Sequence, residues 1–256
     1  MTSTDALKGT VALVTGASSG IGEATALDLA AHGATVAIAA RRKDRLDRLA
    51  EGISGAGGKV LAIESDVSSQ EQAQALVEQT VAEFGRLDTL VNNAGVMLLG
   101  PAVDAPLEEW DQMIAVNLQG LLYCAHAALP HLLSAAQDSP RRIADMVNIS
   151  SVAGRVPRNG SGVYNLTKHG VGAFSEALRQ EVTGRHLRVS LVEPGATNTE
   201  LRLHNRPEIQ ESMTKRFGNI ELLHAQDIAD AITYIVTRPW RVAVNEILIR
   251  PTEQEG

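Results

Sequence analysis

The sequence is poor in the residue types that build disulfide scaffolds, nucleic-acid surfaces and aromatic binding platforms. Of its 256 residues, 3% are aromatic and one, Cys124, is a cysteine. A single thiol cannot form an internal disulfide and suits a reducing compartment, so we expect a cytoplasmic protein. Acidic residues outnumber basic ones by 30 to 23, and the formal net charge of −7 argues against nucleic acid or an anionic membrane surface as a partner.

Long apolar segments are also scarce. No run approaches the roughly 18 apolar residues of a membrane span, and the first residues lack the apolar core of a signal peptide. The seven histidines form no metal-ligand pattern, so we expect no metal site. With 44% hydrophobic and 21% charged residues and no break in composition, the chain fits one α/β domain over residues 1–256.

Short apolar runs alternate with helical patterns along the whole chain. This alternation predicts an α/β fold with a doubly wound parallel sheet and helices on both of its faces. We expect strands in the ranges 10–15, 34–40, 59–64, 87–91, 143–150, 187–193 and 246–250.

Three local features refine or complicate this interpretation. Ser68 and Glu71 have the spacing of a capping box for the helix that runs to residue 85. A long helical pattern from 106 to 136 contains Pro130, where we expect an interruption. Asp145 is an unusual residue for a buried strand, and an exposed strand start is our only account of it.

Three glycines lie between the first predicted strand and the first predicted helix. Gly16, Gly20 and Gly22 have the spacing G-x-x-x-G-x-G, which differs from the commoner G-x-G-x-x-G. A glycine turn at this place lets the backbone approach a phosphate, and the N–H groups of the helix start face the anion. The alternative is a turn with a structural role only.

The end of the second predicted strand indicates which dinucleotide binds. Chains that bind NAD usually place an acidic residue there to bond the ribose hydroxyls. Here Ala40 stands at that position, and Arg41 and Arg42 follow it. Guanidinium groups pair with a 2′-phosphate that an aspartate would repel, so we predict NADP(H). The alternative is that the two arginines begin a solvated helix face.

A tyrosine and a lysine four residues apart suggest acid–base chemistry. Tyr164 and Lys168 would share one face of a helix, and Ser151 stands thirteen residues before the tyrosine at the end of a predicted strand. A lysine ammonium beside a phenol lowers the phenol pKa from about 10 toward useful values. Any helix can contain such a pair by chance, so the surrounding motifs decide the interpretation.

The carboxyl ends of parallel strands bind ligands in open α/β folds. Residues 194–199 contain Pro194, Gly195, Thr197 and Thr199 and interrupt the chain at this edge of the predicted sheet. The pattern from 201 to 223 is polar and irregular, which is typical of a substrate lid. We call this segment the lid.

Taken together and in order, these residues resemble the short-chain dehydrogenase/reductase family over essentially the whole chain. The resemblance implies a Rossmann-type sheet of seven strands and a metal-free site with the tetrad Asn117, Ser151, Tyr164 and Lys168. The matching motifs are Thr15-Gly16-x-x-x-Gly20-x-Gly22, Asp66-Val67, Asn92-Asn93-Ala94-Gly95, Asn117, Ser151, Tyr164-x-x-x-Lys168 and Pro194-Gly195.

The resemblance also implies a role for each member of the tetrad. Tyr164 would donate a proton to the substrate oxygen during carbonyl reduction, and Ser151 would orient that oxygen. Lys168 would lower the tyrosine pKa and bond the nicotinamide ribose, while Asn117 would hold a water. The cofactor contacts predicted from pattern and resemblance are Gly16, Ser18, Ser19, Gly20, Ile21, Gly22, Arg41, Arg42, Asp66, Val67, Asn93, Ala94, Gly95, Tyr164, Lys168, Pro194, Gly195, Thr197 and Thr199.

Several stretches are similar to clavulanic acid dehydrogenases and to bacterial 3-hydroxy acid (serine) dehydrogenases. The main hypothesis is therefore an NADPH-dependent reductase of an aldehyde or ketone. The alternatives are an NADP-dependent dehydrogenase that oxidises a 3-hydroxy acid or another secondary alcohol, and a catalytically silent protein that senses NADP(H). An anionic group on the substrate would meet cationic side chains in the loop before Tyr164 and in the lid: Arg155, Arg158, Arg202, His204 and Arg206.

The resemblance further implies a homo-oligomer, most simply a tetramer, in which two long helices pair across a two-fold axis. The apolar side chains that would form this contact are Leu121, Leu122, Cys124 and Ala125, opposite Phe174, Ala177 and Leu178. The alternative is that both sets face their own sheet.

Overall fold

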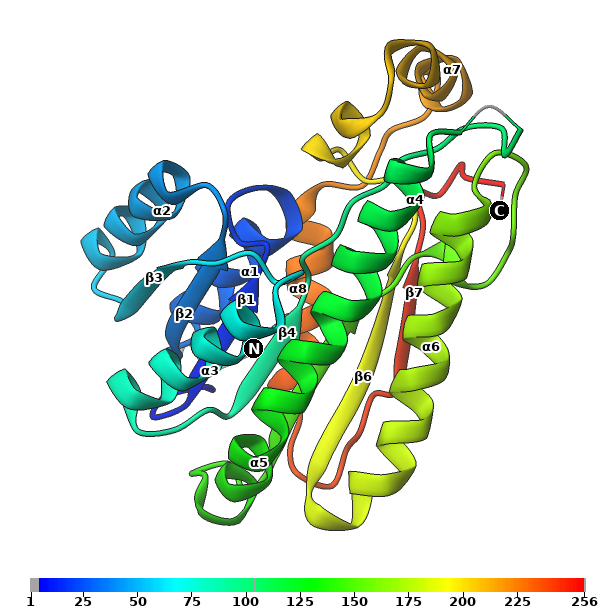
Figure 1. The fold of residues 1–256 in the computed structure, drawn as a ribbon. Helices are drawn as coiled ribbons and strands as arrows, with labels where there is room; N and C mark the ends of the chain where they lie inside the picture. The colour runs from blue at the N-terminus through cyan, green and yellow to red at the C-terminus, as the bar shows by residue number, and fades with distance from the viewer. Residues whose placement is uncertain (1–4, 104, 256) are drawn as a thin grey trace.

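A seven-stranded, all-parallel sheet forms the centre of the protein in the computed structural model, which describes residues 5–103 and 105–255 (Figure 1). The strand order is β3-β2-β1-β4-β5-β6-β7, so the direction of winding reverses between β1 and β4. This sheet confirms the predicted doubly wound α/β class. The strands are β1 Val11–Thr15, β2 Thr35–Ala40, β3 Val60–Glu64, β4 Thr89–Asn92, β5 Ala144–Ile149, β6 Leu187–Pro194 and β7 Glu246–Ile249.

Helices cover both faces of the sheet. Buried side chains of α3, α5 and α6 form a core against one face, and those of α1, α2 and α8 form a core against the other. The α-helices are α1 Gly20–Ala31, α2 Lys43–Gly55, α3 Gln70–Phe84, α4 Leu107–Ile114, α5 Leu121–Asp138, α6 Gly162–Val182, α7 Pro207–Phe217 and α8 Ala225–Val236. The short helices are η1 Ala115–Gly120, η2 Val152–Gly154, η3 Thr183–Arg185 and η4 Glu200–His204.

The apolar strand sequences follow from burial on both faces. Successive side chains of a strand point to opposite faces, so the neighbours Leu13 and Val14 enter different cores although neither is exposed to solvent. A strand covered on both sides has no solvent face on which to place polar residues. This is why β1 and β2 have continuous apolar sequences.

The long helical pattern is not interrupted at Pro130, so that prediction was wrong. Residues 107–138 form one continuous helical segment with Pro130 inside α5. The proline is exposed, and the turns beyond it are held to the core by Leu132, Ala135 and Ala136. Burial of these side chains offsets the lost backbone hydrogen bond.

By length and composition this continuous segment could span a membrane, with a mean hydropathy of 1.2 over 18 residues. Its apolar side chains have another role, however. Cys124, Ala128 and Leu132 pack into the core beneath β4 and β5. The apolar composition of this helical segment is therefore explained by its packing in the protein core.

The predicted capping box of α3 was wrong, because the helix is capped one residue later and by a single side-chain hydrogen bond. Ser69 is the N-cap, and its Oγ accepts a hydrogen bond from the backbone N–H of Gln72 at 3.3 Å. The Gln72 side chain in turn accepts from the N–H of Asp66. Ser68 lies one residue before the N-cap, and its hydroxyl donates to Asp66 Oδ1 at 2.7 Å.

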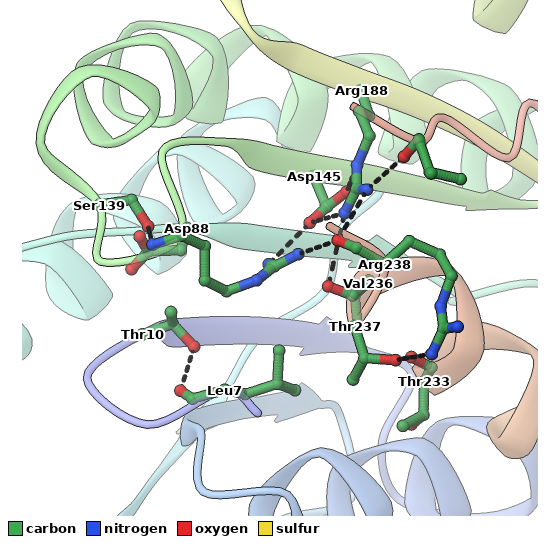
Figure 2. A network of polar contacts seen from close by, with 12 residues as sticks. Leu7, Thr10, Asp88, Ser139, Asp145, Arg188, Thr233, Val236, Thr237 and Arg238 are labelled. Carbon is green, nitrogen blue, oxygen red and sulfur yellow. Dashed lines mark hydrogen bonds and ion pairs between the residues drawn. The ribbon is translucent and has the colours of Figure 1, made fainter. Parts of the chain in front are cut away.

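Asp145 is fully buried, which contradicts the expected exposed strand start. It pairs in register with Arg188 on β6, and the Arg188 guanidinium donates to both carboxylate oxygens, at 2.6 and 3.0 Å (Figure 2). Arg141 donates to the same carboxylate, and Arg188 also donates to the carbonyl of Val242. A buried aspartate is tolerated here because every charge has a hydrogen-bonded partner.

The apolar sets expected at a two-fold axis mostly face their own sheet. Leu121, Cys124, Ala125 and Leu178 are buried within this chain, in the cores on the α5 and α6 side of the sheet. The expected role of these four side chains at a subunit contact was therefore wrong. Leu122 and Ala177 are exposed, and Phe174 is half-buried.

We expect Asp145→Asn to lower the free energy of unfolding by about 3–5 kcal/mol, because Arg188 would keep a buried charge without its carboxylate. Chemical denaturation of wild type and variant measures this difference. Asp47→Asn is the matched control, since its partner Lys43 lies at the surface, and its loss should stay below about 1 kcal/mol. Equal losses in the two variants would contradict the account of the Asp145–Arg188 pair.

Candidate active site

A cavity of about 840 Å³ opens at the carboxyl ends of the strands. It lies where the strand order reverses between β1 and β4, the place at which open α/β sheets bind ligands. Helix α7 stands above this edge of the sheet (Figure 1) and lines the cavity with Met213 and Phe217. The last residue of the lid is tied to the loop after β6, where the N–H of Leu223 donates to the carbonyl of Ala196 at 3.0 Å.

The turn after β1 packs so closely against the loop after β4 that their backbones leave no room for a side chain between them. Gly16 has a φ of +66°, and a Cβ on it would lie 2.8 Å from Ala94 Cα. A Cβ on Gly22 would collide with the Gly16 carbonyl oxygen. Asn93 joins the two segments, because its Nδ2 donates to the Thr15 carbonyl at 2.9 Å. Gly16 and Gly22 are therefore required by packing, whatever ligand binds.

The start of α1 fits a phosphate group. Gly20 has a φ of +56°, and a Cβ there would lie 3.1 Å from Thr199 on the facing loop. Ser19 is the N-cap residue, but its side chain does not cap the helix. First-turn N–H groups without a capping side chain bind anions, and Ser18, Ser19, Gly20 and Ile21 line the cavity at this place.

The two arginines after β2 both line the cavity. Arg42 is held by three partners. Its guanidinium donates to Ser18 Oγ at 2.9 and 3.1 Å, to Ser19 Oγ at 2.8 Å and to Glu200 Oε2 at 2.8 Å. Arg42 therefore lies between the glycine turn and the first residue of η4.

Tyr164, Ser151 and Lys168 lie together on another wall of the cavity. Ser151 lies between β5 and η2, and its Oγ donates to the Pro194 carbonyl at 3.3 Å. Lys168 Nζ lies 5.8 Å from the centre of the Tyr164 ring and donates to the Ile149 carbonyl at 2.8 Å. The i, i+4 spacing on α6 thus brings the phenol and the ammonium to one face, as predicted.

Burial shifts both ionisable groups of this wall. It raises the pKa of Tyr164 to about 12, and an interaction with Ser151 offsets this in part. Burial also lowers the pKa of Lys168 to about 8 from its usual 10.5. The expected net lowering of the Tyr164 pKa by Lys168 is therefore contradicted in this structure, because the loss of hydration is the larger effect.

Asn117 lies in the π-helical segment η1, behind the cavity wall. Its Oδ1 accepts from the N–H of Val96 at 2.8 Å, and its Nδ2 donates to the Val96 carbonyl at 2.9 Å and to Thr167 Oγ1 at 3.2 Å. Single π-helical turns are frequent at functional sites. Here the amide ties the loop after β4 to α6, and the water expected beside it stays a prediction.

Most of the predicted site residues line one cavity. Gly22 and Asn117 do not reach its surface and act through neighbours. Those that line it are Gly16, Ser18, Ser19, Gly20, Ile21, Arg41, Arg42, Asp66, Val67, Asn93, Ala94, Gly95, Ser151, Tyr164, Lys168, Pro194, Gly195, Thr197 and Thr199. Within the described residues, no three His, Cys, Asp or Glu side chains form a possible metal site.

Sequence reasoning missed two side chains that shape the cavity. Gln254, near the end of the chain, accepts from the N–H of Ala196 at 2.8 Å and fixes the loop after β6. Glu200 contacts Arg42 across 158 positions of sequence. Neither contact has a local sequence signal.

Two of the five cationic side chains expected to bind an anionic group are used elsewhere. Arg155 donates to both oxygens of Glu193, at 2.8 and 2.9 Å, and contacts Glu246. Arg206 forms an ion pair with Glu109, in which the Arg206 Nε lies 3.4 Å from the Glu109 Oε1. The expectation for these two was wrong, whereas the other three line the cavity, namely Arg158, Arg202 and His204.

A doubly wound sheet with this turn, this phosphate-binding helix start and a Ser–Tyr–Lys wall defines a class of dinucleotide-dependent oxidoreductases. Comparison with known families agrees, since residues 10–210 match the family model described as short chain dehydrogenase. The chain belongs to the short-chain dehydrogenase/reductase family. It is thus an oxidoreductase that acts on CH–OH or C=O groups.

Individual relatives are similar over most of the chain. An uncharacterized oxidoreductase of Staphylococcus saprophyticus is 37% identical over 97% of this chain and 98% of its own length. A glycine betaine reductase of Emericella nidulans is 39% identical over 97% of this chain, which spans only 19% of that protein. A solved closed form of serine dehydrogenase complexed with NADP+ has a TM-score of 0.87 and 31% identity, covering 96% of this chain and 97% of that one.

We expect the stability of the protein to depend on the protonation of Lys168. Between pH 8 and 10.5 the unfolded chain binds one proton more than the folded chain at this residue, so stability rises with pH in this range. The free energy of unfolding of wild type should therefore rise relative to Lys168→Met by about 1.4 kcal/mol per pH unit.

Chemical denaturation of both proteins between pH 7 and about pH 10 measures this slope. Lys215→Met removes an exposed lysine from α7 and should not reproduce it. A difference between wild type and Lys168→Met that stays constant with pH would contradict the effect of burial on Lys168.

Proposed function

We propose that this protein reduces an aldehyde or ketone to an alcohol with NADPH, with Tyr164 as the general acid. The observation that carries this proposal is the convergence of Ser151, Tyr164 and Lys168 on a cavity that is also lined by the glycine turn and two arginines. Family membership supports the reaction class.

The choice of NADPH is supported by the end of β2. Ala40 lines the cavity where an acidic residue would bond a ribose hydroxyl, and Arg41 and Arg42 lie beside it with Ser18 and Ser19. These side chains suit a phosphate dianion because a guanidinium and hydroxyls can all donate to its oxygens. The solved serine dehydrogenase with NADP+ supports the same choice.

The residues of the chain supply orientation and the proton. When bound, the nicotinamide cofactor supplies the hydride for the carbonyl carbon. Ser151 holds the substrate oxygen beside the Tyr164 hydroxyl, and Tyr164 donates its proton to that oxygen. The raised pKa of Tyr164 keeps the phenol protonated at neutral pH, which is the form required for reduction.

Lys168 stabilises the phenolate that Tyr164 becomes after proton transfer. With a pKa lowered to about 8, the ammonium is charged at neutral pH and favours the negative oxygen on the same helix face. One of its three N–H donors is used by the Ile149 carbonyl. The remaining donors suit ribose hydroxyls and a water that returns the proton to Tyr164.

The substrate pocket has an apolar wall and a cationic rim. Met97 and Leu99 line the cavity and pack in the cluster that contains Tyr164. Arg158 and Arg202 line it as well and suit an anionic substituent. We propose that the lid, which contains α7, closes over a small or medium carbonyl compound. We also propose that the whole chain forms a single catalytic domain.

A second candidate is the oxidation of a 3-hydroxy acid with NADP+. The likeness to serine dehydrogenase favours it, and Arg158 or Arg202 would hold the carboxylate. The same tetrad serves both directions, with Tyr164 then accepting the proton. Turnover of serine or a related hydroxy acid with NADP+ and no carbonyl reduction would favour this candidate.

We also propose a cytoplasmic homotetramer. After the correction above, the side chains that support a subunit contact on α5 and α6 are the exposed Leu122 and Ala177 and the half-buried Phe174. Light scattering at micromolar concentration measures the mass in solution. A monomer would contradict this proposal and leave the proposed reaction untouched.

We expect Arg41→Ala to lower kcat/KM for NADPH by about tenfold or more, because one guanidinium–phosphate interaction is lost. The value for NADH should change little. Steady-state kinetics with both cofactors measures the preference, and Arg48→Ala is the matched control because Arg48 pairs with Asp44 on the exposed side of α2. Equal kcat/KM values for NADH and NADPH in wild type would refute the choice of NADPH.

Tyr164→Phe removes only the phenolic hydroxyl and should lower the rate of carbonyl reduction by about 10²–10⁴-fold. The affinity for NADPH should stay close to that of wild type, because the ring and the backbone remain. Tyr123→Phe, in the groove between α3 and α5, is the matched control and should be fully active. A reduction rate of Tyr164→Phe within about threefold of the wild-type rate would show that another group is the general acid.

A further inference from the structure

Glu200 joins the lid side of the cavity to Arg42, the N-cap residue of α2, and to Arg45 in its first turn. It is the first residue of η4, and its carboxylate lines the cavity. Oε2 accepts from Arg42 at 2.8 Å, and Oε1 accepts from Arg45 at 2.6 Å. One carboxylate thus bridges two guanidinium groups beside the glycine turn.

The carboxylate occupies the kind of position that a phosphate prefers. Arginine binds carboxylates and phosphates with the same planar fork of donors. The Arg42 nitrogens are all engaged, one by Glu200 and two by Ser18 and Ser19. These bonds use four of its five N–H donors, so a phosphate that pairs with Arg42 through two parallel hydrogen bonds has to replace one of these partners.

Glu200 differs from the two serines in what it can offer to an incoming anion. A serine hydroxyl can rotate and donate to a phosphate oxygen, whereas an ionised carboxylate can only accept. The neighbouring Arg45 and Arg42 hold the pKa of Glu200 near 2, so its charge is present at every working pH. A 2′-phosphate therefore meets a fixed negative charge of the same sign.

Two further basic side chains, Arg41 and His204, lie in the same part of the cavity. Arg41 lines the cavity, and the pKa of His204 is lowered by burial first and by Arg42 next, while Glu200 opposes that change. Arg42 and Arg45 thus bind one acidic side chain, with His204 near it and Arg41 in the same part of the cavity. This cluster suits an anion with more charge than a single carboxylate.

We propose that Glu200 is a specificity-determining residue whose carboxylate competes with the cofactor 2′-phosphate for Arg42. The inference rests on the proposed use of NADPH. Binding of the phosphate releases Glu200 from Arg42, leaves it held by Arg45 and thereby loosens η4, whose residues 201–204 begin the lid. Glu200 thus lowers the affinity for NADPH and links cofactor binding to the lid.

The test uses two probes that differ only in the phosphate in question. Adenosine 2′,5′-bisphosphate contains the 2′-phosphate, and adenosine 5′-monophosphate does not. Calorimetric titration measures the affinity of wild type and Glu200→Gln for both probes. The bisphosphate should bind the variant about tenfold more tightly, because one charged interaction that opposes its binding is removed. The affinity for the monophosphate should change little. Glu211→Gln makes the same charge change on α7, where Glu211 pairs with Lys215, and should behave as wild type.

The outcomes separate this inference from the proposed function. Unchanged or weaker bisphosphate binding in Glu200→Gln, or an equal gain for both probes, would overturn the role of Glu200. Wild type that does not prefer the bisphosphate, together with a variant that does, would support Glu200 while contradicting NADPH as the cofactor of the natural chain.

Hydrogen exchange provides a readout that a purely structural role of Glu200 would not change. In wild type the bisphosphate, and not the monophosphate, should speed the exchange of amides in residues 200–204, because displacement of Glu200 loosens η4. In Glu200→Gln the same amides should exchange fast without any probe. Equal exchange of these amides with both probes in wild type would contradict displacement.

Discussion

The close packing of the turn after β1 against the loop after β4 is the contact on which the site depends. A Cβ on Gly16 would collide with the backbone of Ala94, and a Cβ on Gly22 would collide with the Gly16 carbonyl oxygen. The Asn93 side chain donates a hydrogen bond to the carbonyl of Thr15. Side chains larger than hydrogen would separate the two segments at this point. Because the strand order reverses here, the same contact sets the floor of the crevice in which the proposed cofactor lies.

Buried polar groups at the two ends of the sheet differ in whether they have a charged partner. At the amino end, Asp145 and Arg188 are fully paired within the interior. At the carboxyl end, Tyr164 and Lys168 are buried with no pairing carboxylate among residues 5–103 and 105–255, and burial shifts both pKa values. A structure tolerates such a cost where chemistry needs it, so this pair, which lines the cavity, marks the candidate active site.

Much of the fold was predictable because strands buried on both faces leave continuous apolar runs separated by glycine and capping signals. The pairing of Tyr164 with Lys168 and the glycine turn were also predictable, because their residue types and spacing are local, whereas the place of Asn117 in the site came from the resemblance to the family. The failures have two physical causes. Asp145, Glu200 and Gln254 are explained by partners distant in sequence, and Pro130 by packing against the core that outweighs a missing hydrogen bond.

The remaining choice lies between turnover and mere binding of the dinucleotide. A silent sensor would need the glycine turn and the arginines, but it would have no use for a buried phenol beside a serine and an ammonium. The most direct measurement is the nicotinamide absorbance during incubation of NADPH with a panel of aldehydes and ketones, combined with quantification of the alcohol product. The account predicts that at least one carbonyl consumes NADPH in equal amount with the alcohol formed, and that Tyr164→Phe abolishes most of this consumption. Tight binding of NADPH with no alcohol from any member of the panel, and no reverse reaction with hydroxy acids and NADP+, would contradict it.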